Sequence, residues 1–261
     1  MRKLGIYTLS LILILTAGMG CGRKSAEIDP NVTSDQELFE LGEQNIKKDP
    51  EKGRLYFRQV IDSFPRSFYA QRAKLGIADS YFKQGDEGSM IIAASEYREF
   101  ISLFPYSPSA AYAQYQIAMS YFNKVLKPGR DQSKTEQALL EFRQVINKFP
   151  LSEETEQARE KVRDCEERLA QHSFTVAYHY YKRRAYKAAV SRLTEILTEF
   201  PNFSEMDRVY FVLADSYYRG TLYEDSVPYF QKLISDYPNS RFASLAVKRM
   251  AEIEKIPIKK D

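Results

Sequence analysis

The sequence is poor in the residues that most often build metal sites, disulfides and catalytic centres. Its 261 residues include two cysteines, two histidines and no tryptophan. His172 and His179 are seven residues apart, about 10 Å along a helix, which is too far for a shared zinc ion. Cys165 has no base pattern near it, so we expect a small buried side chain rather than a nucleophile. The sequence contains no zinc-protease, nucleophile-elbow, P-loop or dinucleotide-binding motif, and we therefore expect no enzyme, no cofactor and no metal ion.

The chain also has little net charge, with 38 basic and 35 acidic residues. Without residues 1–20 it would carry 36 basic and 35 acidic residues. Nucleic-acid binding needs clustered positive charge, so we expect no nucleic-acid partner. Carboxylates are plentiful, and an acid pair assembled from distant segments, as in helical cell-wall lyases, is the enzymatic alternative that stays open.

The first 20 residues have the organisation of a secretory signal peptide. Arg2 and Lys3 precede an apolar run that is short for a membrane-spanning helix. The sequence "GMGC" ends at Cys21 and resembles the lipobox of bacterial lipoproteins, in which the cysteine becomes the lipidated first residue. Gly18 stands where that pattern usually has leucine, so ordinary signal cleavage and an uncleaved anchor helix are the alternatives. The resemblance implies a lipid anchor on Cys21, and the glycine after it favours the outer membrane.

Residues 21–33 have no apolar periodicity and predict a flexible, lipid-anchored tether. Ser34 and Glu37 have the spacing of an N-terminal capping box, so the first helix is expected to begin there. We expect one folded domain over residues 34–255 and a C-terminal tail over residues 256–261, either a disordered end or a docking segment.

Two stretches of the chain nearly repeat each other, "FRQVIDSFP" from Phe57 and "FRQVINKFP" from Phe142. Proline disfavours helical backbone in the residue before it and cannot continue a helix, so each aromatic–proline pair predicts a helix end. The pairs recur at intervals typical of stacked helical units. The five predicted helix ends are Phe64-Pro65, Phe104-Pro105, Phe149-Pro150, Phe200-Pro201 and Tyr237-Pro238.

A second mark precedes four of these ends, a small residue followed three positions later by tyrosine. This pattern resembles the tetratricopeptide repeat, in which the small residue lets two helices approach and the large one fills the space to the neighbouring hairpin. The small residues are Ala78, Ala118, Ala177 and Ala214, and the large ones are Tyr81, Tyr121, Tyr180 and Tyr217. We expect an all-α solenoid of about five helical hairpins plus a C-terminal helix.

Residues 151–173 break the rhythm by adding a charged helical segment. Asp164 and Arg168 have i,i+4 spacing for a solvent-facing pair, and Val162, Cys165 and Leu169 form a narrow apolar stripe. We interpret the segment as an elongated first helix of the fourth hairpin, with a projecting interaction surface as the alternative.

A candidate binding groove follows from aromatic residues that recur on the first helix of successive hairpins. Rings offer contact area at low entropic cost, and neighbouring cations can pair with a carboxylate, which suits an extended peptide with apolar side chains. The alternative is that these rings are core between repeats. The candidate groove residues are Phe82, Lys83, Tyr112, Tyr115, Phe122, Tyr178, Tyr181, Lys182, Phe211, Tyr218 and Arg219.

The order of features resembles the BamD family of outer-membrane assembly lipoproteins: signal peptide, lipobox-like cysteine, tether, five repeat units and a final helix. The segment over residues 57–86 is especially similar to that family. The resemblance implies a non-enzymatic, lipid-anchored scaffold of the β-barrel assembly machinery on the periplasmic face of the outer membrane. Its expected partners are the periplasmic domains of the barrel insertase and unfolded outer-membrane proteins. The alternative is another envelope adaptor, for cell-wall coordination or as a pilotin.

Overall fold

The computed structural model describes residues 34–256. The predicted signal peptide, Cys21 and the tether lie outside the described residues, as does the end of the tail. The regular elements of the described residues are eleven α-helices: α1 Asp35–Ile46, α2 Pro50–Ser63, α3 Phe68–Gln84, α4 Glu87–Leu103, α5 Ala110–Phe122, α6 Ser133–Lys148, α7 Glu153–Lys182, α8 Tyr186–Glu199, α9 Met206–Arg219, α10 Tyr223–Asp236 and α11 Arg241–Ile253. They form five antiparallel hairpins followed by α11, which confirms the predicted tetratricopeptide-type solenoid.

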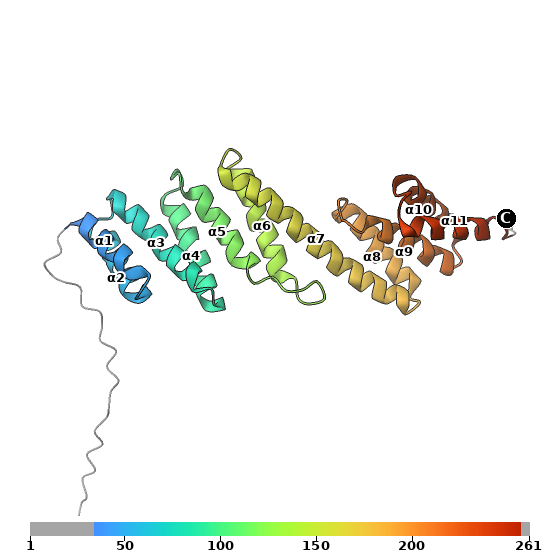
Figure 1. Ribbon diagram of the computed structural model, residues 1–261, viewed down its shortest axis with the longest axis horizontal. Helices are drawn as coiled ribbons and strands as arrows, with labels where there is room; N and C mark the ends of the chain where they lie inside the picture. Colours follow the sequence, from blue (N-terminus) through green and yellow to red (C-terminus); the bar gives the residue numbers. More distant parts are fainter. Residues whose placement is uncertain (1–33, 257–261) are drawn as a thin grey trace, which may run out of the picture.

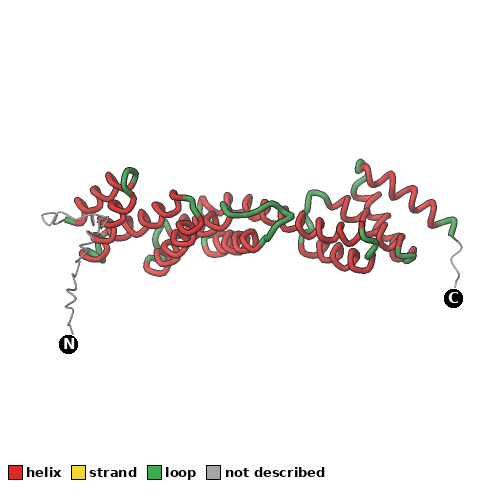
Figure 2. Tube along the Cα trace, turned by 90° about the horizontal axis from the view of Figure 1, so that it is seen from below, coloured by secondary structure: helices red, strands yellow, loops and turns green. Residues whose placement is uncertain are grey.

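The hairpins stack side by side into an elongated array, with α1 at one end and α11 at the other (Figures 1 and 2). Each helix packs on the helices before and after it in the sequence, so the cores lie between neighbouring hairpins. The turns within hairpins lie along the lower edge in Figure 1, and the turns between hairpins lie along the upper edge. We call these the hairpin edge and the proline edge.

Every aromatic–proline pair ends a helix, as predicted. The aromatic residue adopts the same non-helical backbone at all five positions, with φ near −130° and ψ between 51° and 59°. Its N–H still donates to the carbonyl four residues earlier, as from Phe64 to Val60. Its carbonyl accepts from the residue three positions later, as from Ser67 to Phe64 at 2.9 Å. One turn geometry is therefore used five times, because the same proline constraint recurs.

The small residues of the repeat are fully buried, with Ala78, Ala118, Ala177 and Ala214 all 0% exposed. Of the four tyrosines predicted to fill the space between hairpins, three are partly buried as expected. Tyr180 is the exception at 37% exposed, so that part of the prediction is wrong. It lies near the end of α7, which in Figure 1 extends beyond α6.

Helix α7 is continuous over 30 residues, which confirms the elongated first helix of the fourth hairpin. Its part up to Leu169 packs on α6 and contributes Ala158, Cys165 and Leu169 to the core of the third hairpin. Its second half contributes Phe174 and Ala177 to the core shared with α8 and α9. The helix therefore joins two cores, which explains why its apolar stripe extends through the inserted segment.

The predicted pair of Asp164 and Arg168 does not form. Asp164 pairs with Lys161 at 3.0 Å, and Arg168 donates instead to the carbonyl of Leu126 at 2.9 Å. His172 lies one turn further on, with Nδ1 2.5 Å from the carbonyl oxygen of Pro128. Both side chains hold the long α5–α6 turn against α7, a role that local spacing does not reveal.

Candidate functional site

The predicted groove residues lie on four first helices: α3, α5, α7 and α9. All eight rings are partly buried, and all three cations are exposed. The rings fall into separate cores rather than one contact network. Phe82 and Tyr112 pack in one, Tyr115 and Phe122 in the next, and the remaining rings in the cores of the last two hairpins.

Each ring contacts other rings of its own or a neighbouring hairpin. Tyr115 and Phe122 both contact Phe142, with centroids 5.5 and 5.8 Å apart from it. Phe211 stacks on Phe242 of α11, and Tyr178 stacks on Tyr181. These contacts favour the alternative that the rings fill space between repeats, while each ring keeps an exposed part.

Tyr181 and Arg219 are brought together at the carboxylate of Asp215, and Tyr218 lies beside them against Arg249. That carboxylate is 1% exposed and accepts from the Tyr181 hydroxyl, from Arg219 Nε and from Arg249 Nε. Burial raises the pKa of Tyr181, and the hydrogen bond to Asp215 adds to the rise. Tyr218 donates to Glu252, which also pairs with Arg249. This cluster joins α7, α9 and α11.

The three predicted cations therefore differ in what they can do. Arg219 is already neutralised by Asp215, so it is a poor partner for a peptide carboxylate. Lys83 and Lys182 form no ion pair within residues 34–256. Of the predicted groove residues, Lys83 also lines a hollow in the surface.

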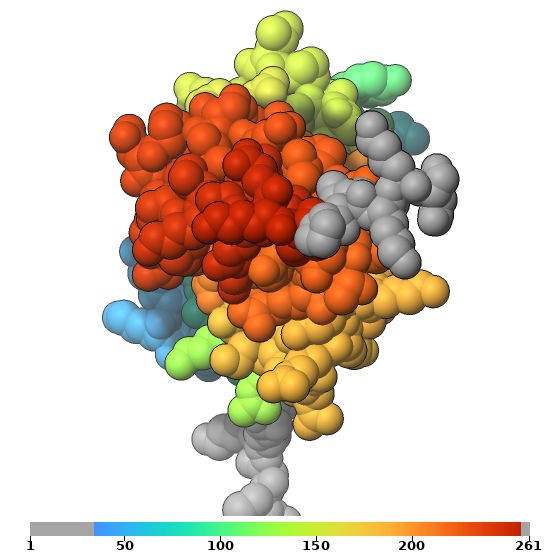
Figure 3. Space-filling view, turned by 90° about the vertical axis from the view of Figure 1, so that its right-hand side faces the viewer, coloured from blue at the N-terminus to red at the C-terminus, as the bar shows by residue number. Residues whose placement is uncertain are grey.

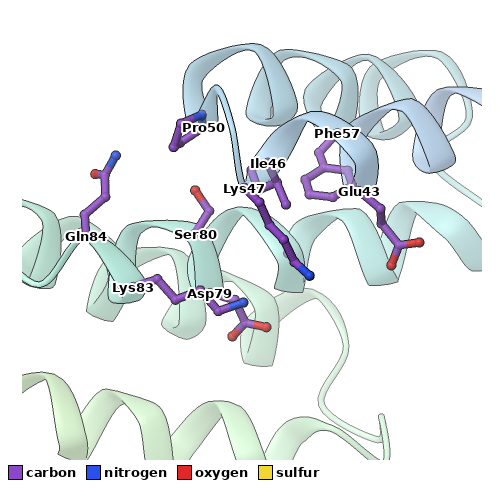
Figure 4. A pocket seen from close by; sticks show the side chains of 10 residues that line it. Glu43, Ile46, Lys47, Pro50, Phe57, Asp79, Ser80, Lys83 and Gln84 are labelled. Atoms are coloured by element: carbon purple, nitrogen blue, oxygen red, sulfur yellow. The ribbon is translucent and has the colours of Figure 1, made fainter.

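That hollow lies between the first hairpin and α3 and has a volume of about 710 Å³. Figure 4 shows the side chain of Lys47 extending from α1 toward α3, where Lys83 and Asp79 lie together. The wall facing them combines the apolar Ile46, Pro50 and Phe57 with the charged Glu43 and Lys47. The lining residues are Glu43, Ile46, Lys47, Pro50, Phe57, Gly76, Asp79, Ser80, Lys83 and Gln84.

Two glycines shape this hollow by letting helices approach the Phe57 ring. A Cβ at Gly42 would lie 2.4 Å from the ring, and a Cβ at Gly76 would lie 2.8 Å from it. Phe57 is thus packed between α1 and α3 with one edge in the hollow. This site was not predicted from the sequence, although glycine within two helical segments, near the phenylalanine of the repeated stretch, is a signal for a close helix contact.

A second hollow of about 440 Å³ continues along α3 and shares Glu43, Phe57, Gly76 and Asp79 with the first. Phe68, which is 69% exposed, lines it together with Arg72. We refer to the two hollows together as the α3 groove. A mostly preformed groove with an apolar wall and a few charges suits a short peptide segment.

The charges of the α3 groove come in both signs. Asp79 accepts from the hydroxyls of Tyr97 and Tyr112, at 2.5 and 2.9 Å. Burial and the neighbouring carboxylate raise the pKa of Tyr112 to about 12. Next to Asp79 on α3, the Ser80 hydroxyl accepts from the fully buried Arg54 of α2. The groove thus offers fixed donors and acceptors along an apolar surface.

The described residues support neither a reactive thiol nor a metal centre. Cys165 is 0% exposed, and burial raises the pKa of its thiol to about 12, which opposes formation of a nucleophilic thiolate. No group of histidine, cysteine or acidic side chains in the described part of the chain could hold a metal ion. The same residues include no helix with the length and apolarity needed to cross a bilayer.

Stacked hairpins with a lateral groove define a tetratricopeptide-type repeat scaffold. The family model YfiO, described as outer membrane lipoprotein, matches residues 31–228. The chain belongs to this family of outer membrane lipoproteins.

Three curated relatives bear the name outer membrane protein assembly factor BamD. The protein of Caulobacter vibrioides is 27% identical over 80% of this chain and 68% of its own length. Those of Haemophilus influenzae and Neisseria gonorrhoeae are 24% and 26% identical, each over 77% of this chain and 79% of their own length. Among solved structures, the TPR2AB-domain:pHSP90 complex of yeast Sti1 is 13% identical with a TM-score of 0.42, over 84% of this chain and 86% of that chain.

Proposed function

We infer that this chain is an assembly factor for outer membrane proteins and works as a non-enzymatic scaffold. The observation that carries the inference is the match to the outer membrane lipoprotein family over residues 31–228, together with relatives named as assembly factors. Five stacked hairpins provide a long surface on which several proteins can bind at once.

The finer proposal concerns anchoring and partners. Lipid on Cys21 would hold the solenoid at the outer membrane, facing the periplasm. The periplasmic domains of a barrel insertase and unfolded outer-membrane proteins would be its partners. We place the unfolded segment in the α3 groove, because the groove joins an apolar wall with unpaired Lys83 and with Lys47. The predicted rings on α5, α7 and α9 would extend the contact where their exposed parts allow.

The experiment is affinity purification of the full chain from detergent-solubilised membranes of its own organism, with co-purifying proteins identified by mass spectrometry. We expect a β-barrel insertase with periplasmic repeats. Recovery of cell-wall or secretin components without an insertase would overturn the proposal in favour of another envelope adaptor.

The groove is tested separately by a photo-reactive residue at Gln84, which lines it, and a matched one at Lys248, an exposed position on α11. Gln84 should cross-link to newly made outer-membrane proteins and Lys248 should not. Equal cross-linking at both positions would overturn the placement of the unfolded segment in the α3 groove, without affecting the proposed assembly role.

A further inference from the structure

The two edges of the solenoid carry opposite charge. The turns of the hairpin edge, residues 47–52, 83–88, 123–134, 182–187 and 219–225, hold 13 basic and 7 acidic residues. The turns of the proline edge, residues 62–67, 102–109, 148–156, 199–207 and 236–241, hold 3 basic and 8 acidic residues. A nearly neutral chain is therefore polarised across its width.

The positive charge is concentrated in two neighbouring turns of the hairpin edge. Residues 123–134 and 182–187 contain eight cations and one carboxylate, Asp131. None of the eight cations forms an ion pair within residues 34–256. Six of them are exposed: Lys127, Arg130, Lys182, Arg183, Arg184 and Lys187. We call residues 123–134 and 182–187 the basic ridge.

The two turns lie close together because α7 connects them. Arg168 and His172 hold the α5–α6 turn through the carbonyls of Leu126 and Pro128. Lys182 is ten residues beyond His172 on the same helix, about 15 Å along its axis. Seen from the C-terminal end, the green and gold residues of these turns project at the lower side, and the start of α7 projects at the opposite side (Figure 3). The two turns thus project on the same side of the solenoid.

The ridge keeps a cation where glycine would be easier to accommodate. Arg184 has a φ of +61°, in the left-handed region, and its N–H donates to the carbonyl of Tyr181. Thr221 has the same conformation and the matching bond after α9, and Gly85 occupies left-handed backbone after α3. A non-glycine residue there costs free energy. The side chain of Arg184 adds a charge at that cost.

We propose that the basic ridge binds the anionic phospholipid surface of the membrane and orients the solenoid with its acidic edge away from the lipid. Exposed cations without an ion-pair partner on projecting turns are attracted to an anionic lipid surface. Leu126, 49% exposed beside Lys124 and Lys127, can enter the interface between them. The predicted tether over residues 21–33 spans at most about 45 Å, so an anchor on Cys21 would keep a membrane within reach.

The test uses the chain from residue 21 with Cys21→Ser, which carries no lipid. Its probes are phosphatidylcholine vesicles with and without phosphatidylglycerol. We expect sedimentation with the anionic vesicles only, and its loss at high salt. The double variant Arg183→Glu with Lys187→Glu should bind at least about twentyfold more weakly. Lys248→Glu with Lys255→Glu makes the same charge change on exposed residues outside the ridge and should bind almost as the parent does.

A second pair of variants separates charge from folding. Arg184→Gly should bind anionic vesicles about fivefold more weakly while unfolding at the same or a higher urea concentration. Thr221→Gly should relieve the same backbone conformation without weakening binding. The proposal would be overturned if the chain bound neutral and anionic vesicles equally, or if the two double variants lost the same amount of binding. It would also be overturned if Arg184→Gly bound anionic vesicles as the parent does. Cross-linking of Arg183 to an acidic protein, with no vesicle binding, would also overturn it.

Discussion

The hydroxyl of Tyr181 on α7 donates a hydrogen bond of 2.5 Å to the carboxylate of Asp215 on α9, 34 residues later. The same buried carboxylate accepts from Arg219 of its own helix and from Arg249 of α11. One side chain therefore joins α7, α9 and α11. Removing one partner of such a cluster leaves buried polar groups without partners.

We predict that Asp215→Asn destabilises the protein by about 2–4 kcal/mol, because a neutral amide leaves Arg219 without a carboxylate partner and Arg249 with Glu252 alone. The loss stays below that of a fully enclosed pair, since both arginines are partly exposed. Urea unfolding measures the change. Asp236→Asn, which removes an exposed pair with Lys232, is the matched control and should leave the midpoint unchanged. Equal effects of the two variants would contradict the importance of the buried cluster.

Alkaline pH should destabilise the fold through tyrosines that contact carboxylates. Burial raises the pKa of Tyr112 to about 12 from its ordinary value of 10.0, and burial raises the pKa of Tyr97 as well. A tyrosine whose pKa is higher in the folded than in the unfolded protein contributes its full stabilisation at any pH below its unfolded-state pKa. This contribution is lost as the pH rises through the folded-state pKa. Stability should therefore fall between about pH 10 and 12.

Urea midpoints across that range, together with tyrosinate absorbance, measure this loss. Tyr112→Phe should make the fall shallower. Tyr106→Phe, at a ring that is 98% exposed, should leave the profile as it is. A parent-like profile for Tyr112→Phe would mean that the contact with Asp79 does not control this titration.

Gly76→Ala should destabilise the protein by about 1–3 kcal/mol, because the new Cβ would lie 2.8 Å from the Phe57 ring. The displaced ring would also narrow the α3 groove. Gly129→Ala is the control, since nothing lies within 4 Å of its added Cβ. Urea unfolding of both variants checks the stability effect. A Gly76→Ala protein as stable as the control would show that Phe57 can move away at little cost.

The thiol of Cys165 should resist modification in the folded protein. It is fully buried, and the pKa of about 12 leaves little thiolate at neutral pH. In the Cys21→Ser chain, a thiol reagent should label Cys165 slowly in buffer and rapidly in urea. Labelling as fast in buffer as in urea would place the first half of α7 away from the third hairpin, contrary to the structure.

The fold could be predicted from the sequence because its determinants are local. Each aromatic–proline pair fixes a helix end by backbone geometry, and each small residue marks a close helix contact within one hairpin. The long α7 followed from an uninterrupted helical pattern without a proline. Tyr180 was mispredicted, because its exposure depends on where α6 lies beside α7.

The candidate site was harder to predict, since its contacts join residues far apart in the chain. From the sequence, Arg219 was predicted to be available to a ligand. In the structure it pairs with Asp215, which is buried by helices whose positions the repeat pattern does not predict. The α3 groove depends on Gly42 and Gly76 meeting one ring from two helices. Local spacing identified Lys83 but not the wall opposite it.

The most direct test of the central claim is depletion of the chain in its own organism, followed by measurement of folded barrel proteins in the outer membrane. We expect folded barrel proteins to decrease and unfolded ones to accumulate in the periplasm, while inner-membrane proteins stay constant. A chain carrying Asp236→Asn should restore the barrels. Unchanged barrel levels after depletion, or a defect confined to the cell wall, would contradict the role in outer-membrane protein assembly.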